Sequence, residues 1–179
     1  MELIGVRIRL RPFLIQDLNR MVVWNRDQEV QAYVDCDLPD ELDELKVWYQ
    51  TSKGDQCYWI FAIETMEGDL IGDLELDHIC WNRREAELRI RIGEKTFWGK
   101  GFGSEAIKLI LDYMLIFREF HRIYLRVYNF NQRAIYCYRK FGFKPIGILR
   151  RNSPGWKNII LMELTKADYQ KKVLSPIAG

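Results

Sequence analysis

The chain has 179 residues, of which 48% are apolar and 29% are charged, and its formal net charge is +2. This balance excludes a disordered chain and is typical of one soluble globular domain, which we place over residues 1–179. So small a net charge gives no reason to expect a nucleic-acid partner. The N-terminus has no signal-peptide pattern, and no segment approaches the roughly 18 apolar residues of a membrane span, so we expect a cytoplasmic protein without a membrane partner.

The first half of the chain begins with a strand pattern. Apolar residues at every second position predict a strand over residues 4–10, ended by Pro12. Short helices are expected over residues 16–25 and 27–33. A third helix should begin with Pro39 at its first helical position, carry acids in its first turn and end near Gly54.

Three strand-like segments follow, with a hairpin turn at Glu67-Gly68. They cover residues 58–64, 70–79 and 85–92. Their short connections predict an antiparallel meander.

The pattern of the second half becomes helical after a glycine-rich turn. A long helix is expected to residue 117, then a strand over 123–127, a helix from Asn131 to a Gly142 cap, and closing strands over 145–149 and 159–164. The strand-helix-strand order predicts a parallel pair beside the meander. The fold class is therefore mixed α/β.

Cysteine and histidine are too few and too scattered for a metal site. The cysteines, which are Cys36, Cys57, Cys80 and Cys137, form no CxxC pair, and the chain has only two histidines. A zinc site needs several such ligands that converge. We therefore expect no metal, and free thiols in a reducing compartment.

The glycine-rich turn is the strongest chemical signal. Gly99, Gly101 and Gly103 alternate just before the long helix. Glycines let backbone N–H groups approach a ligand, and a helix N-terminus attracts anions, so the turn suits a pyrophosphate, with Lys100 as an added cation. The pattern Gly101-x-Gly103-x-x-Ala106 also fits a dinucleotide fingerprint, which leaves an NAD(P)-dependent enzyme as an alternative. That fingerprint should directly follow a parallel strand, and residues 93–97 intervene here.

Two segments together resemble the GNAT acetyltransferase superfamily, in its ribosomal-protein and spermidine acetyltransferase-like branch. One is Trp98-Gly99-Lys100-Gly101-Phe102-Gly103, and the other runs from Asn131 to Phe143 and includes Ala134, Tyr138 and Gly142. Trp98 departs from the Gln or Arg that most members carry. The resemblance implies the acyl-CoA N-acyltransferase fold, with a mostly antiparallel central sheet, a splayed parallel pair and helices on both faces.

The resemblance also implies acetyl-CoA as cofactor and acetyl transfer to a primary amine by direct attack. Backbone groups near the end of the strand over residues 85–92 should pair with the pantetheine arm like an added strand. The glycine-rich turn should hold the pyrophosphate, and Asn131 should bind the pantetheine or place its loop. The implied cofactor residues are Ile90, Arg91, Ile92, Trp98, Gly99, Lys100, Gly101, Phe102, Gly103, Ser104, Asn131, Arg133, Ala134 and Tyr138.

Tyr138 and Glu87 are the candidate catalytic residues. The resemblance places Tyr138 near the thioester sulfur, where a phenol can protonate a departing thiolate. Glu87 is a candidate general base, and the competing interpretation is an exposed strand residue facing Arg89 or Arg133. Glu75, on a neighbouring strand, could share the role of base.

The resemblance implies an acceptor that is a small-molecule amine, such as a polyamine, or a protein N-terminus. Acids including Asp35 and Asp37, with Glu75 and Tyr33, are candidates for binding a cationic substrate, although the acid run also suits a solvated helix start. A non-catalytic acyl-CoA-binding module remains a further alternative. An exposed sheet edge would be compatible with a homodimer or a higher homo-oligomer.

Overall fold

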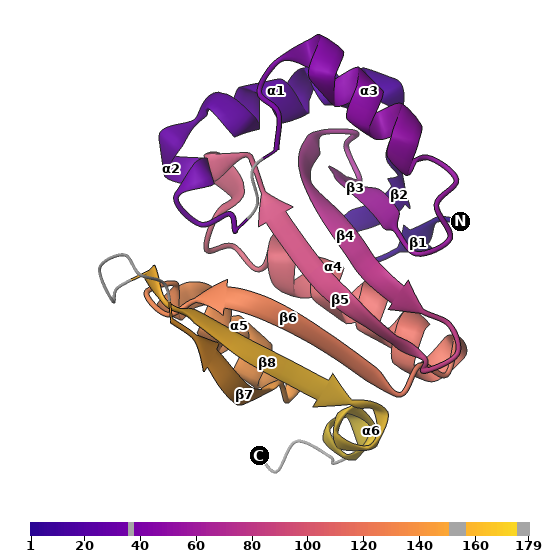
Figure 1. The fold of residues 1–179 in the computed structure, drawn as a ribbon. Coiled ribbons are helices and arrows are strands. Elements are labelled where there is room, and N and C mark those ends of the chain that lie inside the picture. Colours follow the sequence, from indigo (N-terminus) through magenta and orange to yellow (C-terminus); the bar gives the residue numbers. More distant parts are fainter. Residues whose placement is uncertain (36–37, 151–156, 175–179) are drawn as a thin grey trace.

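The computed structural model describes residues 1–35, 38–150 and 157–174. Within them the chain forms one sheet of eight strands in the order β1-β2-β3-β4-β5-β6-β8-β7, with helices on both faces (Figure 1). The strands are β1 (Leu3–Ile4), β2 (Ile8–Pro12), β3 (Trp59–Thr65), β4 (Leu70–Cys80), β5 (Glu85–Ile92), β6 (Arg122–Tyr128), β7 (Lys144–Leu149) and β8 (Ile159–Thr165).

The helical elements lie between and after the strands. They are η1 (Ile15–Asp17), α1 (Leu18–Arg26), α2 (Gln28–Gln31), α3 (Leu42–Ser52), η2 (Lys95–Phe97), α4 (Phe102–Leu111), the π-helical η3 (Asp112–Phe117), α5 (Gln132–Phe141) and α6 (Lys166–Leu174). None of the described helices is long and apolar enough to cross a membrane.

The meander is confirmed, because β3, β4 and β5 pair antiparallel in chain order. The single strand predicted over residues 4–10 is wrong. The chain turns between Ile4 and Ile8, and β1 pairs back on β2. Alternation alone could not show this break, because the turn residues Gly5, Val6 and Arg7 continue the alternating pattern.

Two helix predictions also need correction. Pro39 is not the first residue of α3, which begins three residues later at Leu42 with Glu41 as its N-cap. The long helix after the glycine-rich turn is α-helical only to Leu111 and continues as a π-helix to Phe117. Helix α6 was not predicted at all.

The parallel pair β5–β6 opens into a cleft. Its residue pairs run only from Glu85 with Arg122 to Glu87 with Tyr124, whereas β5 continues to Ile92 and β6 to Tyr128. Figure 1 shows the two strands side by side at their first residues and apart at their ends. From Leu88 onward β5 therefore has a partner strand, β4, on one side only.

The sheet has a hydrophobic core on each face, as its alternating side chains require. On β3, Phe61 and Ile63 join the larger core with α4, while Ala62 joins the core of α1, α2 and α3. The larger core packs β5 against α4, which fixes the strand and the helix start relative to each other at the cleft.

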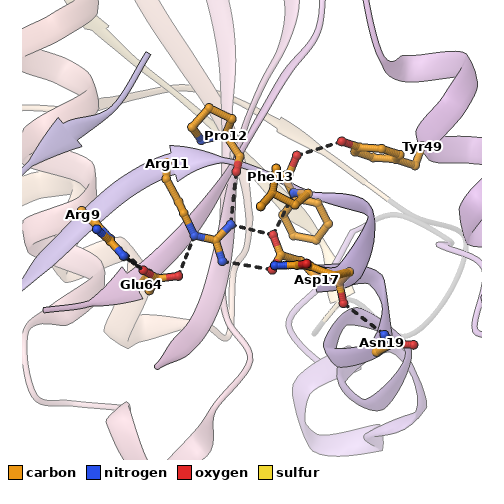
Figure 2. Close-up of polar contacts among 10 residues, drawn as sticks. Arg9, Arg11, Pro12, Phe13, Asp17, Asn19, Tyr49 and Glu64 are labelled. Carbon is orange, nitrogen blue, oxygen red and sulfur yellow. Dashed lines mark hydrogen bonds and ion pairs between the residues drawn. The ribbon is translucent and has the colours of Figure 1, made fainter. Parts of the chain in front are cut away.

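A buried ionic network ties the edge of the sheet to α1 (Figure 2). The Arg11 guanidinium lies between two carboxylates, with Nη1 at 2.7 Å from Asp17 Oδ2 and Nε at 2.6 Å from Glu64 Oε2. Arg9 also pairs with Glu64. Asp17 in turn accepts the backbone N–H of Leu14 at 2.8 Å. The network fixes the point where the chain leaves β2 and enters the helices that cover the cleft.

Candidate functional site

A pocket of about 380 Å³ occupies the cleft between β5 and β6. Side chains from β4, β5, β6, α4, α5 and the segment after α2 line it. The pocket thus includes nearly all of the residues predicted from the sequence. Lys100 is an exception: it is exposed and does not line the pocket, and its carbonyl accepts a hydrogen bond from Arg7 Nη1.

The glycine-rich turn forms one end of the pocket. Gly99 and Gly101 have positive φ of 71° and 86°, a region that glycine enters without steric cost. Gly101 is the N-cap of α4, and no side chain caps that helix end. The N–H groups of the first turn, from Phe102 to Ser104, are therefore available to an anion.

Trp98 joins the two sides of the cleft. Its indole Nε1 donates to the Ile92 carbonyl at 2.7 Å, which fixes the turn to the end of β5. The Arg133 guanidinium stacks on the indole with Cζ at 4.6 Å from the ring centroid. The ring of Tyr33, which follows α2, meets the indole edge-on at 5.8 Å. Trp98 therefore has a definite structural role at a position where most family members have Gln or Arg.

Helix α5 supplies the opposite wall. Asn131 caps it, since its Oδ1 accepts the N–H of Ala134 at 3.2 Å. Arg133 has no hydrogen bond or ion pair among the described residues, so its cation faces the pocket without a carboxylate partner. Ser104 Oγ and Cys137 Sγ are 3.1 Å apart and link α4 to α5.

Tyr138 is buried in the pocket wall, and its ring packs edge-on against Phe143 at 5.7 Å. Its hydroxyl has no hydrogen-bond partner within the described part of the chain. Burial raises the pKa of Tyr138 above its ordinary value, and the neighbouring Cys137 adds to the shift. The phenol therefore keeps its proton at neutral pH.

Strand β4 carries three acids on one face, at Asp73, Glu75 and Asp77. Asp73 is buried and accepts hydrogen bonds from Arg91 Nε at 2.9 Å and Nη2 at 2.6 Å. Arg91 also donates to Asn25 Oδ1 at 2.6 Å, so its side chain is fully engaged with β4 and α1. Only the backbone of Arg91 is left to contribute to a ligand in the cleft.

Glu75 is the pocket carboxylate with the loosest ion pair. It is buried, and its nearest cation is Arg89 Nη1 at 3.8 Å. Burial, with the added repulsion of Asp73, raises the pKa of Glu75 to about 7. A carboxylate with that pKa can accept and release a proton at neutral pH.

Glu87 is buried, so the interpretation of an exposed strand residue is wrong. Its carboxylate accepts from Arg126 Nε at 2.8 Å and lies near Arg89 Nε at 3.5 Å and His78 Nδ1 at 3.4 Å. Arg133, the other cation considered from sequence, stacks on Trp98 instead. Glu87 is therefore held by two arginines, with the imidazole of His78 close by.

The acidic segment after α2 is only partly described. Asp35 lines the pocket, with Oδ2 at 3.7 Å from Arg126 Nη1. Asp37 lies outside the described residues. The acids at the start of α3 do not line the pocket, which agrees with the solvated helix start considered above.

Sequence reasoning missed Arg126 and the Asp73–Arg91 pair. The alternation of Asp73, Glu75 and Asp77 with leucines was a usable signal, because it places three carboxylates on one face of a strand. Arg126 had no such signal. Arg126 can pair with Glu87 only because β6 separates from β5 after Glu87, and no local sequence pattern reveals where two strands separate.

The residues present fit a CoA molecule. The uncapped N-terminus of α4 and the unpaired Arg133 are suited to the phosphates, and the free side of β5 to the amide groups of the pantetheine arm. A nicotinamide dinucleotide fits less well, since η2 separates β5 from the turn.

The comparisons with known proteins agree with this geometry. A family model described as an acetyltransferase (GNAT) domain matches residues 7–144. Spermidine N(1)-acetyltransferase of Vibrio cholerae is 31% identical over 143 residues, which are 80% of this chain and 82% of that protein. The Escherichia coli K12 enzyme of the same name is 29% identical over 172 residues, 94% of this chain and 91% of the relative.

Solved structures match as well. The crystal structure of the Vibrio cholerae spermidine N-acetyltransferase in complex with CoA and spermine has a TM-score of 0.83 and 27% identity, and the match covers 93% of this chain and 99% of that one. A dodecameric structure of the same enzyme has a TM-score of 0.79 and 27% identity, and covers 92% and 97% of the two chains.

Proposed function

Since this chain belongs to the GNAT acetyltransferase family and is an acetyl-CoA-dependent N-acetyltransferase that acts on a primary amine, we propose that its acceptor is a polyamine. The observation that carries the proposal is the buried, loosely paired carboxylate of Glu75 in the pocket, with Asp35 and Glu87 nearby. Several acids at one pocket suit a ligand with several ammonium groups. The spermidine acetyltransferases among its relatives support the same acceptor class.

The proposed site divides the cofactor between two elements. The backbone of β5 from Ile90 to Ile92 would hold the pantetheine arm, and the turn from Trp98 to Ser104 with Arg133 would hold the phosphates. When bound, acetyl-CoA supplies an activated acetyl thioester, so the protein needs no covalent intermediate of its own.

Glu75 is proposed as the general base. The acceptor enters as an ammonium ion and must lose a proton before its nitrogen can attack. Glu75 has a pKa of about 7 and lines the pocket, so it can take that proton directly or through one water. Glu87 is less suited to this step, because Arg126, Arg89 and His78 already surround its carboxylate.

Tyr138 is proposed as the general acid. Its hydroxyl holds a proton at neutral pH and has no competing hydrogen bond in the described chain. That proton is available to a departing thiolate sulfur, whose basicity is comparable to that of a phenol.

An acceptor panel tests the proposal. Thiol release from acetyl-CoA would be followed with spermidine, spermine, putrescine, peptides with ribosomal-protein N-termini, and aminoglycosides. We expect the highest kcat/KM with spermidine or spermine. Butylamine is the matched control, since it has the chain of putrescine without the second ammonium group, and it should react slowly. A peptide or an aminoglycoside that outperforms the polyamines would overturn the assignment.

We also infer that the chain forms a homo-oligomer through the outer edge of β7. Ile146, Ile148 and Leu149 are exposed on this strand, which is the last of the sheet. The dodecamer of the Vibrio cholerae relative supports self-association. Light scattering after size exclusion should give a multiple of 21.4 kDa for the parent chain.

Ile148→Lys should reduce the mass of the oligomer, because a charge on an apolar edge opposes pairing. Val47→Lys is the control: Val47 is equally exposed but lies on α3. An unchanged mass for Ile148→Lys would exclude β7 as the interface.

A further inference from the structure

The turn between β1 and β2, residues 5–7, is hydrogen-bonded to the first turn of α4. Glu105 Oε1 accepts the backbone N–H groups of Val6 at 2.7 Å and Arg7 at 2.8 Å, and Glu105 Oε2 accepts Arg7 Nε at 2.9 Å. Gly5 permits this approach, since a Cβ there would lie 2.5 Å from Glu105 Oε1. Two segments almost a hundred residues apart are thereby joined behind the glycine-rich turn, and neither Arg7 nor Glu105 lines the pocket.

The negative charge of Glu105 would disfavour an anion at the N-terminus of α4. It lies in the first turn of α4, the same turn whose N–H groups face the pocket. A free carboxylate there would favour the helix but oppose the binding of an anion at its N-terminus. Partial burial disfavours its charge, yet the N–H groups of Arg7 and Val6 and the Arg7 guanidinium outweigh that effect and hold the pKa of Glu105 below its usual value. The carboxylate is charged, and Arg7 is the cation that neutralises it.

Arg7 also holds the turn itself. Its Nη1 donates to the Lys100 carbonyl at 2.9 Å, and its guanidinium lies over the Phe102 ring at 4.6 Å from the centroid. Its Nη2 is 3.2 Å from the place where a Cβ on Gly101 would stand. One side chain thus contacts Lys100 and Phe102 and lies beside Gly101, the N-cap of α4.

We propose that Arg7 is a positioning residue for the phosphate site of acetyl-CoA, which it serves by neutralising Glu105 and by fixing the turn from Lys100 to Phe102. The inference rests on the proposed placement of the cofactor phosphates at that turn. Arg7 acts from behind the turn and does not itself line the pocket.

Calorimetric binding of CoA to the purified chain is the test, with KM values for acetyl-CoA and spermidine alongside it. Arg7→Met should weaken CoA binding about tenfold, the effect of losing roughly 1.4 kcal/mol, and should raise the KM for acetyl-CoA. The KM for spermidine should not change. Arg7→Lys keeps the positive charge but loses the planar guanidinium, which donates to Glu105 and to the Lys100 carbonyl at the same time. It should bind CoA with an affinity between those of the parent and of Arg7→Met.

The double variant Arg7→Met with Glu105→Gln separates this inference from a merely structural role. It should bind CoA more tightly than Arg7→Met alone, because the uncompensated charge is gone. Arg9→Met is the matched control, since Arg9 is about as exposed as Arg7 and pairs with Glu64 and Glu2 away from the turn. It should bind CoA like the parent chain.

Two results would overturn the inference: parental CoA affinity in Arg7→Met, or a double variant that binds no better than Arg7→Met. If Arg7→Met does not fold, the same comparison is made between Arg7→Lys and Arg7→Lys with Glu105→Gln. The variant Gly101→Val tests separately whether the cofactor phosphates bind at the glycine-rich turn at all. Normal CoA binding in that variant would place the phosphates elsewhere and remove the proposed site itself.

Discussion

Tyr138 is a buried residue that lines the pocket, and its hydroxyl has no hydrogen-bond partner in the described chain. If it protonates the departing sulfur, Tyr138→Phe should lower kcat by about 10²-fold or more while CoA affinity stays near that of the parent. Steady-state kinetics and calorimetry would measure the two effects separately. Parental turnover in the phenylalanine variant would remove Tyr138 from the mechanism.

Glu75 should set the pH dependence of the reaction. Its pKa of about 7 means that the carboxylate is mostly protonated below neutral pH and ionised above it. As a base it must be ionised, so kcat/KM for spermidine should rise with pH and show an inflection near 7. The titration of the amine itself lies near pH ~10 and remains separate.

Glu75→Gln should lower kcat/KM about 10²-fold and abolish that inflection. Glu87→Gln is the matched comparison, because Glu87 is an equally buried glutamate on the next strand. An inflection that survives in the Glu75 variant and disappears in the Glu87 variant would assign the base to Glu87.

Residues whose roles depend on a local pattern could be predicted from the sequence. Asn131 and Gly142 cap α5 as expected, and Gly101 starts α4, because caps depend on the nearest few residues. Arg7 and Arg126 could not be found in this way. Their partners, Glu105 and Glu87, lie 98 and 39 residues away in the chain, and only the folded sheet brings them together.

At the scale of elements, the turn before α4 should tolerate no side chain at Gly101. A valine there must adopt a φ of 86°, and its Cβ would lie 3.2 Å from Arg7 Nη2. We expect Gly101→Val to abolish CoA binding in calorimetry, because the first turn of α4 can no longer present its N–H groups.

The control for Gly101→Val carries the same strain elsewhere. Gly68 has a φ of 97° in the hairpin between β3 and β4 and has open space around its Cβ position. Gly68→Val should lower the stability of the chain and leave CoA affinity unchanged. Equal loss of CoA affinity in both variants would indicate general destabilisation instead of a phosphate site.

Elements with long apolar repeats were predicted well, and short ones were not. The meander and β6 matched within one or two residues, since each has a buried face that repeats every second position. The turn that divides β1 from β2 has no breaker beyond Gly5, and it is stabilised by Glu105 from a distant helix. The splay of β5 from β6 came from the family resemblance and is confirmed, but no periodicity could have shown where it begins.

For the whole molecule, the buried Glu75 should lower stability as the pH rises from about 4.5 to about 7. The folded-state pKa of Glu75 is raised from 4.5 to about 7, so between these values the unfolded chain releases a proton that the folded chain keeps. The free energy of unfolding therefore falls as pH rises through this window, by on the order of 3 kcal/mol for this group.

Urea unfolding of the parent and of Glu75→Gln at pH 5 and pH 8 would measure this effect. Groups remote from Glu75 titrate alike in both chains, so the difference between the two reports on Glu75 together with its coupled neighbour Asp73. The glutamine variant should gain stability relative to the parent at pH 8 and little at pH 5. A constant difference at the two pH values would contradict a raised pKa.

The splay between β5 and β6 also affects how the molecule avoids aggregation. An unpaired strand edge is ordinarily a template on which another chain can add a strand. The free side of β5 faces β6, the next strand of the same sheet, and does not lie at an outer edge of the sheet (Figure 1). The exposed edges are β1, which has only two residues, and β7, which begins with Lys144 and Pro145. The molecule thus keeps the unpaired backbone of β5 inside its own sheet, and among the described strands β7 offers the longer outer edge for pairing with a second protein chain.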